Sequence, residues 1–173
     1  MEENKKNSVF VKEIAYQIGP LIKSKKAVLS FKGSLLIRHP AWVVPSFHRV
    51  WPKKFSEEMV SYQALHDIFA IMQDAGERVV VMDSHDLRNH PEKVVSAWCE
   101  NMGIPARLDA LTWERGMPED WHTWAEWFKR TSESTGFIPT SAKSPPPLSE
   151  KLAKIVDANR PLYHALEAHK LQL

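Results

Sequence analysis

Three short apolar runs, each ending in charged residues and separated by helical patterns, constrain the fold of this chain most. The runs are Val9–Val11, Leu35–Ile37 and Val79–Met82. Short continuous apolar runs suit parallel strands that helices cover on both faces. Strands that alternate with helices predict a parallel sheet joined by right-handed crossovers. The sequence therefore predicts an α/β domain with a small parallel sheet and helices on both of its faces.

The segments between these runs carry helix signals. Proline fits the first position of a helix, so His39-Pro40 predicts a helix start. Ser56 followed by two glutamates predicts another start, because serine caps a helix and acidic residues suit the positive end of its dipole. The predicted helices are Glu13–Ile22, Pro40 to about Val50, Ser56 to Gly76, Pro91 to Gly103, Asp120–Glu133, and one or two helices within Leu148–Leu173, interrupted near Pro161.

The composition is that of an ordinary folded domain, with 43% hydrophobic and 25% charged residues in a chain of 173. This length favours one domain. We expect residues 1–143 to form the α/β domain, and residues 144–173 to form a proline-rich linker and C-terminal helices packed on the same domain. The net charge of +2 is too small to indicate nucleic acid or an anionic membrane as a partner.

Cysteine usage and hydropathy bear on the compartment. Cys99 is the only cysteine, so no intramolecular disulfide can form and a reducing compartment is expected. No stretch reaches the roughly 18 apolar residues of a membrane helix, and the polar N-terminus lacks the apolar centre of a secretory signal. We therefore expect a soluble cytoplasmic protein.

Polar residues follow each predicted strand. Lys12-Glu13 follow the first, Arg38-His39 the second, and Asp83 to Asp86 the third. The carboxyl ends of parallel strands meet at one edge of the sheet, where such folds bind ligands. These groups are either proton-transfer groups of a site, or solvated pairs, turn formers and helix caps. The catalytic candidates are Lys12, Glu13, His39, His85 and Asp86.

Tryptophan is concentrated in one segment. Four of the seven tryptophans fall between Trp113 and Trp127, and Trp121, Trp124 and Trp127 are three positions apart. The stripe is either a helix face packed on the core or an aromatic wall beside an apolar ligand. The sequence has no His-Glu-x-x-His motif and no Cys/His cluster, so we expect no metal site.

The segment around Arg38 resembles part of a known family. It reads LLIRHPAWVVPSFHR, with a strand ending in Arg38, then Pro40, and Ser46 eight positions after the arginine. This pattern resembles the sulfotransferase segment that binds the 3′-phosphate of the donor nucleotide. A guanidinium at the strand end offers a charged fork that matches phosphate oxygens, and the serine hydroxyl can face the same rim.

Three other segments agree with the resemblance. VVVMDSHDLRNHPEKVVSAWCENMGIP resembles the family's strand, acidic turn and following helix, while LTWERGMPEDW and VFVKEIAY resemble segments of a bacterial and fungal branch. The resemblance covers roughly residues 8–137. It implies a sulfotransferase-like fold, which is a P-loop NTPase-like fold, and 3′-phosphoadenosine-5′-phosphosulfate (PAPS) as the donor.

The sequence also departs from the family's pattern. Sulfotransferases hold the 5′-phosphosulfate with a loop between a strand and a helix, but none of the six glycines forms a glycine-rich loop there. Ile14 stands where common sulfotransferases place a catalytic histidine, and the later Gly-x-x-Gly-x-x-Lys segment is missing. We therefore expect the fold without its first strand–loop–helix unit, and weak or no PAPS binding. The open sheet edge would close up or be covered by another chain, as in a homodimer.

Three functions stay open at this point. The first is a cofactor-independent enzyme of secondary metabolism that cyclises or isomerises a largely apolar small molecule. The second is a sulfotransferase that binds PAPS or its product adenosine 3′,5′-bisphosphate (PAP), with a partner chain supplying the loop. The third is a non-catalytic binding or structural remnant. The residues expected to bind the anion or the substrate are Arg38, Ser46, Tyr16, Trp113, Trp121 and Trp124.

Overall fold

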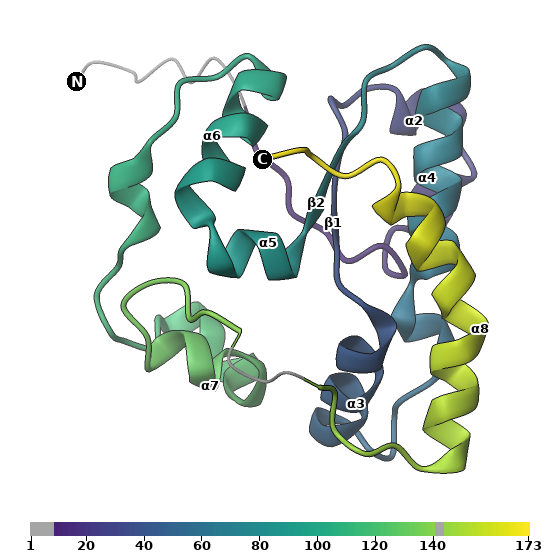
Figure 1. Ribbon diagram of the computed structural model, residues 1–173, viewed down its shortest axis with the longest axis vertical. Coiled ribbons are helices and arrows are strands. Elements are labelled where there is room, and N and C mark those ends of the chain that lie inside the picture. Colours follow the sequence, from purple (N-terminus) through teal and green to yellow (C-terminus); the bar gives the residue numbers. More distant parts are fainter. Residues whose placement is uncertain (1–8, 141–143) are drawn as a thin grey trace.

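The computed structural model describes residues 9–140 and 144–173, which are built around two short parallel strands (Figure 1). Strand β1 (Ser34–Ile37) pairs with β2 (Val80–Asp83), with Ser34 opposite Val80 and Ile37 opposite Asp83. The aligned register brings the carboxyl ends of both strands to the same edge of the sheet. It therefore confirms the predicted small parallel sheet for these two runs.

The C-terminal segment extends the sheet on the far side of β2. Lys170 forms an isolated parallel bridge with Val81, and the N–H of Leu171 donates to the carbonyl oxygen of Val81 at 2.9 Å. Strand β2 thus has hydrogen-bonding neighbours on both of its edges. In Figure 1 the C-terminus lies close to the middle of the molecule, beside the two strands.

Helices cover both faces of the sheet. Figure 1 shows α4 and α8 on one side of the strands, and α5 and α6 on the other. The helices of the described residues are α1 (Gly19–Ile22), α2 (Lys25–Val28), α3 (Pro40–Val50), α4 (Tyr62–Asp74), α5 (Ser84–Asn89), α6 (Pro91–Met102), α7 (Ala125–Ser132) and α8 (Glu150–Glu167), with 3₁₀ helices η1 (Glu57–Val60), η2 (Leu108–Leu111) and η3 (Glu119–Trp124).

The core lies where α8 packs across α3, α4 and the sheet. Ile37 of β1, Val44 of α3, Val81 of β2, and Val156 and Leu166 of α8 are each at most 1% exposed. Burying side chains of this size contributes about 1.5–3 kcal/mol each, so α8 is part of the same packed unit as the strands. Among the residues described, no helix is both long and apolar enough to cross a lipid bilayer.

Several predicted boundaries are confirmed. The helix expected to begin at Pro40 runs to Val50, and the helix expected between Pro91 and Gly103 ends with Gly103 at a φ of 71°. A positive φ is where glycine has no steric cost. The helix expected across Asp120–Glu133 is present as η3 followed by α7.

Three other predictions are wrong. Val9–Val11 is not a strand, because it has no ladder partner, and its side chains are 84%, 73% and 52% exposed. The helix expected from Ser56 is broken at Ser61, which has a φ of 68°. Helix α8 continues through Pro161 without interruption. Pro161 is exposed, so water can satisfy the carbonyl that loses its helical donor.

Candidate functional site

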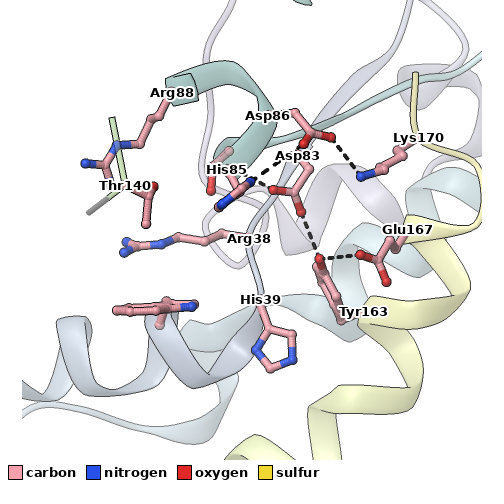
Figure 2. A pocket seen from close by; sticks show the side chains of 12 residues that line it. Arg38, His39, Asp83, His85, Asp86, Arg88, Thr140, Tyr163, Glu167 and Lys170 are labelled. Atoms are coloured by element: carbon pink, nitrogen blue, oxygen red, sulfur yellow. Dashed lines mark hydrogen bonds and ion pairs between the residues drawn. The ribbon is translucent and has the colours of Figure 1, made fainter. Parts of the chain in front are cut away.

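A pocket of about 280 Å³ opens at the carboxyl ends of the two strands (Figure 2). Its walls come from the ends of β1 and β2, the starts of α3 and α5, the last turn of α8 and the segment after it. This is the edge where ligands bind in α/β sheets. The residues that line it are Arg38, His39, Trp42, Asp83, Ser84, His85, Asp86, Arg88, Thr140, Tyr163, Glu167 and Lys170.

Two helix caps fix the rim of this pocket. His39 Nδ1 accepts a hydrogen bond from the N–H of Ala41 at 3.2 Å, which caps α3. Asp83 Oδ1 accepts from the N–H of His85 at 2.6 Å, which caps α5. Each cap satisfies a backbone donor that the helix itself leaves unpaired. The same bonds hold both side chains at the strand ends.

One side of the pocket is cationic. Figure 2 shows Arg38 and Arg88 on the same side, near Thr140. Arg88 Nε donates to the carbonyl oxygen of Ile138 at 2.7 Å, whereas Arg38 makes no ion pair within residues 9–140 and 144–173. Burial and the positive charge of Arg88 lower the pKa of Arg38. A bound anion would therefore stabilise the charged form of the Arg38 guanidinium.

The opposite side of the pocket is a carboxylate network. Asp83 is 5% exposed, and its Oδ2 lies 2.9 Å from the hydroxyl oxygen of Tyr163. The same hydroxyl oxygen lies 2.9 Å from Glu167 Oε1. Burial, followed by the hydrogen bonds with Glu167 and Asp83, raises the pKa of Tyr163, so the phenol stays protonated. This wall of the pocket can therefore hold protons.

An ion pair joins this wall to the end of the chain. Lys170 Nζ donates to Asp86 Oδ2 at 2.8 Å. That hydrogen bond raises the pKa of Lys170 against the opposing effect of burial. Lys170 is therefore paired, unlike Arg38.

The structure brings four of the sequence candidates together at the pocket: Arg38, His39, His85 and Asp86. Lys12 and Glu13 are exposed and do not line it, so the expected meeting of three polar clusters is wrong for this pair. The physical reason is that the strand expected to carry them to the rim does not form. Tyr16 and Ser46, both half-buried, also lie outside the lining.

The tryptophan stripe lies away from the pocket. Trp124 and Trp127 pack against Trp51 at the end of α3, with ring centroids 5.6 and 5.1 Å apart. Trp121 stacks on Phe128 at 4.4 Å, and Trp113 meets Phe137 edge to face at 5.6 Å. These contacts are packing contacts between helices and loops. The tryptophan that lines the pocket is Trp42, and the ring of Tyr163 lines it as well.

Sequence reasoning missed half of the lining residues: Trp42, Arg88, Thr140, Tyr163, Glu167 and Lys170. One signal was available for the last three. Tyr163, Glu167 and Lys170 are four and three positions apart, a spacing that predicts a polar stripe on one helix face, although α8 ends at Glu167 and Lys170 lies just beyond it. Nothing local in the sequence connects that stripe with Asp83, which is 80 residues away from Tyr163.

The comparisons with known proteins agree with this architecture. A family model described as a sulfotransferase domain matches residues 2–170, so the chain belongs to the sulfotransferase family. Its α/β fold with a small parallel sheet is consistent with that membership. No solved structure matches the chain with significance.

Two curated relatives come from Arabidopsis thaliana. The chain is 34% identical over 144 residues to branched-chain-amino-acid aminotransferase-like protein 1, and 30% identical over 141 residues to branched-chain-amino-acid aminotransferase-like protein 2. Each match covers 80% of this chain and 24% of the relative. The chain thus spans about a quarter of the length of these relatives.

Proposed function

We propose that this sulfotransferase-family domain binds a small phosphate or sulfate ester in the pocket at the ends of β1 and β2. The observation that carries the proposal is Arg38, a half-buried guanidinium without an ion pair among the described residues and with a second arginine beside it. Two neighbouring guanidinium groups repel each other, and a dianion between them removes that repulsion. A ligand with one phosphate or sulfate group suits the cationic side.

The nucleotide PAP is the first ligand to test. The family resemblance assigns the 3′-phosphate to Arg38 and Ser46, and Arg38 does line the pocket while Ser46 does not. Strand β1 is followed by Arg38-His39 and strand β2 by Ser84-His85, and neither connection is a glycine-rich loop. We therefore expect Arg38 to hold one phosphate and the second phosphate to add little, which predicts weak binding. We likewise expect PAPS, the donor form of this nucleotide, to bind weakly or not at all.

Calorimetric titration of the full chain with PAP and with inorganic sulfate tests the proposal. Losing charge-assisted hydrogen bonds worth about 1.5–3 kcal/mol predicts that Arg38→Ala weakens binding roughly 10- to 100-fold. Arg38→Lys should weaken it less, because the charge remains while the fork is lost. Arg107→Ala is the control, since Arg107 is exposed and pairs with Asp109. Equal affinities of wild type and Arg38→Ala would refute the proposal.

A second candidate is the cofactor-independent enzyme, which would cyclise or isomerise a small molecule. It is supported by the cavity beside Arg38 and by the proton-holding groups on its opposite wall. The tryptophan contacts give it no support, because the aromatic wall is elsewhere. In this case His85→Ala, which removes a pocket imidazole, should lower kcat on the substrate and leave Tm unchanged. A non-catalytic binding role predicts ligand binding without turnover.

Assembly and compartment are further parts of the proposal. Among the described residues β1 pairs with β2 and with no other strand, and Leu36 on β1 is 51% exposed. A second copy of the chain could cover this strand, which would bury exposed apolar area. Analytical ultracentrifugation that finds only monomer at high concentration would exclude the homodimer. The single cysteine, Cys99, suits a cytoplasmic location.

A further inference from the structure

The pocket at the ends of β1 and β2 carries opposite charges on its two sides. Figure 2 shows Arg38 and Arg88 on one side, and Asp83, Tyr163 and Glu167 on the other. Within residues 9–140 and 144–173 neither arginine forms an ion pair, and no lysine or arginine lies within ion-pair distance of Asp83 or Glu167. Each side of the pocket can therefore attract a ligand group of the opposite charge.

The charges of the lining balance. It contains three basic and three acidic side chains, which are Arg38, Arg88, Lys170, Asp83, Asp86 and Glu167. Lys170 and Asp86 already pair with each other at 2.8 Å. A bound dianion adds two negative charges to this balanced lining, and an ammonium group on the same ligand cancels one of them. A ligand that carries both groups is therefore bound with less electrostatic repulsion than a simple dianion.

Glu167 has the acceptor atom that suits the ammonium group. The Tyr163 hydroxyl oxygen lies 2.9 Å from both Asp83 Oδ2 and Glu167 Oε1, but a phenol donates only one hydrogen bond. Asp83 is 5% exposed, whereas the Glu167 side chain is 34% exposed. The phenol therefore donates to Asp83, because an acceptor without a donor costs more free energy when it is buried. Glu167 Oε1 then has no donor among the described residues.

The Glu167 carboxyl group is ionised. Burial raises the pKa of Glu167, but hydrogen bonds with His164 and Tyr163 outweigh it and lower that pKa. His164 Nδ1 lies 3.0 Å from Oε2, which leaves the other oxygen, Oε1, for a ligand. A carboxylate oxygen of this kind accepts a charge-assisted hydrogen bond from an ammonium group.

We propose that the pocket selects a phosphate or sulfate ester that also carries an ammonium group, such as an aminoalkyl phosphate. The ester group binds at Arg38 and Arg88, and the ammonium group binds at Glu167. The inference rests on the proposed function for the ester group, and it adds the cationic end of the ligand.

The distance between the two binding positions is fixed by the fold. Arg38 directly follows β1, which pairs with β2, and Asp83 ends β2. The hydrogen bond between Asp83 and Tyr163 attaches α8 to that strand end, and Glu167 is the last residue of α8. We therefore expect the affinity to depend on the length of the chain that joins the ester and ammonium groups of the ligand.

Calorimetric titration of the full chain with matched ligands tests the inference. The pairs are 2-aminoethyl phosphate against ethyl phosphate, and 4-aminobutyl phosphate against butyl phosphate. At about pH 8 all of these phosphate groups are dianions, because their second pKa is about 6. We expect the wild type to bind at least one aminoalkyl phosphate roughly 3- to 10-fold more tightly than its alkyl counterpart, as suits a charge-assisted hydrogen bond at a half-exposed carboxylate.

Glu167→Gln should remove this preference. The variant loses the attraction for the ammonium group and the repulsion of the phosphate, so the aminoalkyl phosphate binds more weakly and the alkyl phosphate slightly more tightly. A purely structural role of Glu167 would instead weaken the binding of both ligands. Glu150→Gln, an exposed change at the other end of α8, should keep the wild-type preference.

Arg38→Ala separates the failure of this inference from the failure of the proposed function. If Arg38→Ala weakens both kinds of ligand but the wild type binds the two members of each pair equally, the inference is overturned and the proposed function stands. An unchanged preference in Glu167→Gln would also overturn the inference. If the wild type binds none of the four phosphates, or if Arg38→Ala binds them as tightly as the wild type, the proposed function fails and the inference with it. The wild-type comparison decides the inference even if Glu167→Gln does not fold.

Discussion

His39 shares its imidazole between the fold and the pocket. Its Nδ1 accepts the N–H of Ala41, and its ring meets that of Tyr163 edge to face at 5.0 Å. Only the form with an unprotonated Nδ1 can accept that bond. Burial, then the positive charges of Arg160 and His164, lower the pKa of His39 below 6.5. The folded state therefore favours the same protonation state that caps the helix.

This shift predicts the pH dependence of stability. Below about pH 6.5 the unfolded chain binds more protons at His39 than the folded chain, so stability falls as the pH falls towards the lowered pKa. An asparagine in place of this histidine would cap α3 without titrating. His39→Asn should therefore reduce the loss of unfolding free energy between about pH 7 and pH 5.5, by roughly 0.3–0.5 kcal/mol because solvent screens the partly exposed ring. Urea denaturation measures it.

His122→Asn is the matched control, because His122 is exposed on η3. Its loss of stability between the two pH values should equal that of the wild type. An unchanged pH dependence in His39→Asn would show that the imidazole contributes nothing to acid sensitivity.

The pocket residues differ in how well their positions can be predicted from the sequence. Arg38 and Asp83 were predictable, because a charged residue directly after a short apolar run lies at a strand end. His85 and Asp86 follow from the same rule. Glu167 is a different case, since its place depends on how α8 packs across the sheet, and no local pattern encodes that. The half of the lining that depends on tertiary packing therefore could not be predicted from local sequence patterns.

At the scale of elements, the break between η1 and α4 shows where local signals mislead. The apolar spacing from Met59 to Met72 suits one helix, yet Ser61 adopts a left-handed conformation with a φ of 68°. This break puts Val60 and Tyr62 in the core, where they are 4% and 2% exposed. Tertiary burial of these two side chains thus overrides helix continuity.

Replacing the strained serine should stabilise the protein. A left-handed conformation costs an L-residue about 1–2 kcal/mol, and glycine avoids most of it at an entropic cost of about 0.5–1 kcal/mol. The Ser61 side chain makes no capping bond to α4, and the one hydrogen bond of its hydroxyl, to the carbonyl oxygen of Met59, is long for an O–H donor at 3.1 Å. Ser61→Gly should therefore raise the unfolding free energy by up to about 1 kcal/mol in urea denaturation.

Ser56 provides the comparison, since it precedes η1, also lacks a capping bond, and has an extended φ of −127°. Ser56→Gly gains nothing at that φ and should be neutral or destabilising. If both substitutions changed stability equally, the strain at Ser61 would not be the cause.

Strand prediction failed at Val9–Val11 for a related reason. A short apolar run becomes a strand only if another strand offers it a ladder, and the sequence does not show which edges are free. The edge of β2 that a third strand could use is taken by Lys170 and Leu171. Two residues at the end of a mostly helical segment give no strand signal, so this pairing could not be predicted.

At the scale of the whole molecule, the C-terminal segment pairs with the free edge of β2. These contacts predict the effect of removing the segment. Lys170 pairs with Val81 and Asp86, and the N–H of Leu171 donates to Val81. Deleting residues 170–173 leaves the edge of β2 unpaired and Asp86 without its cation. One backbone hydrogen bond and one half-buried ion pair amount to about 2 kcal/mol. For a chain of this length that lowers Tm by about 4–8 °C.

Deleting only residues 172–173 is the matched control for this truncation. It retains Lys170 and Leu171 and removes Leu173, which is 52% exposed. Thermal unfolding of the two truncated proteins should therefore differ, with the shorter deletion close to the full chain. Sulfate binding should weaken in the longer deletion as well, because Lys170 lines the pocket and the freed Asp86 adds negative charge beside it. Equal Tm values for the two deletions would mean that the pairing of Lys170 and Leu171 with β2 contributes nothing to stability. Helix α8 alone would then hold the C-terminal region on the sheet.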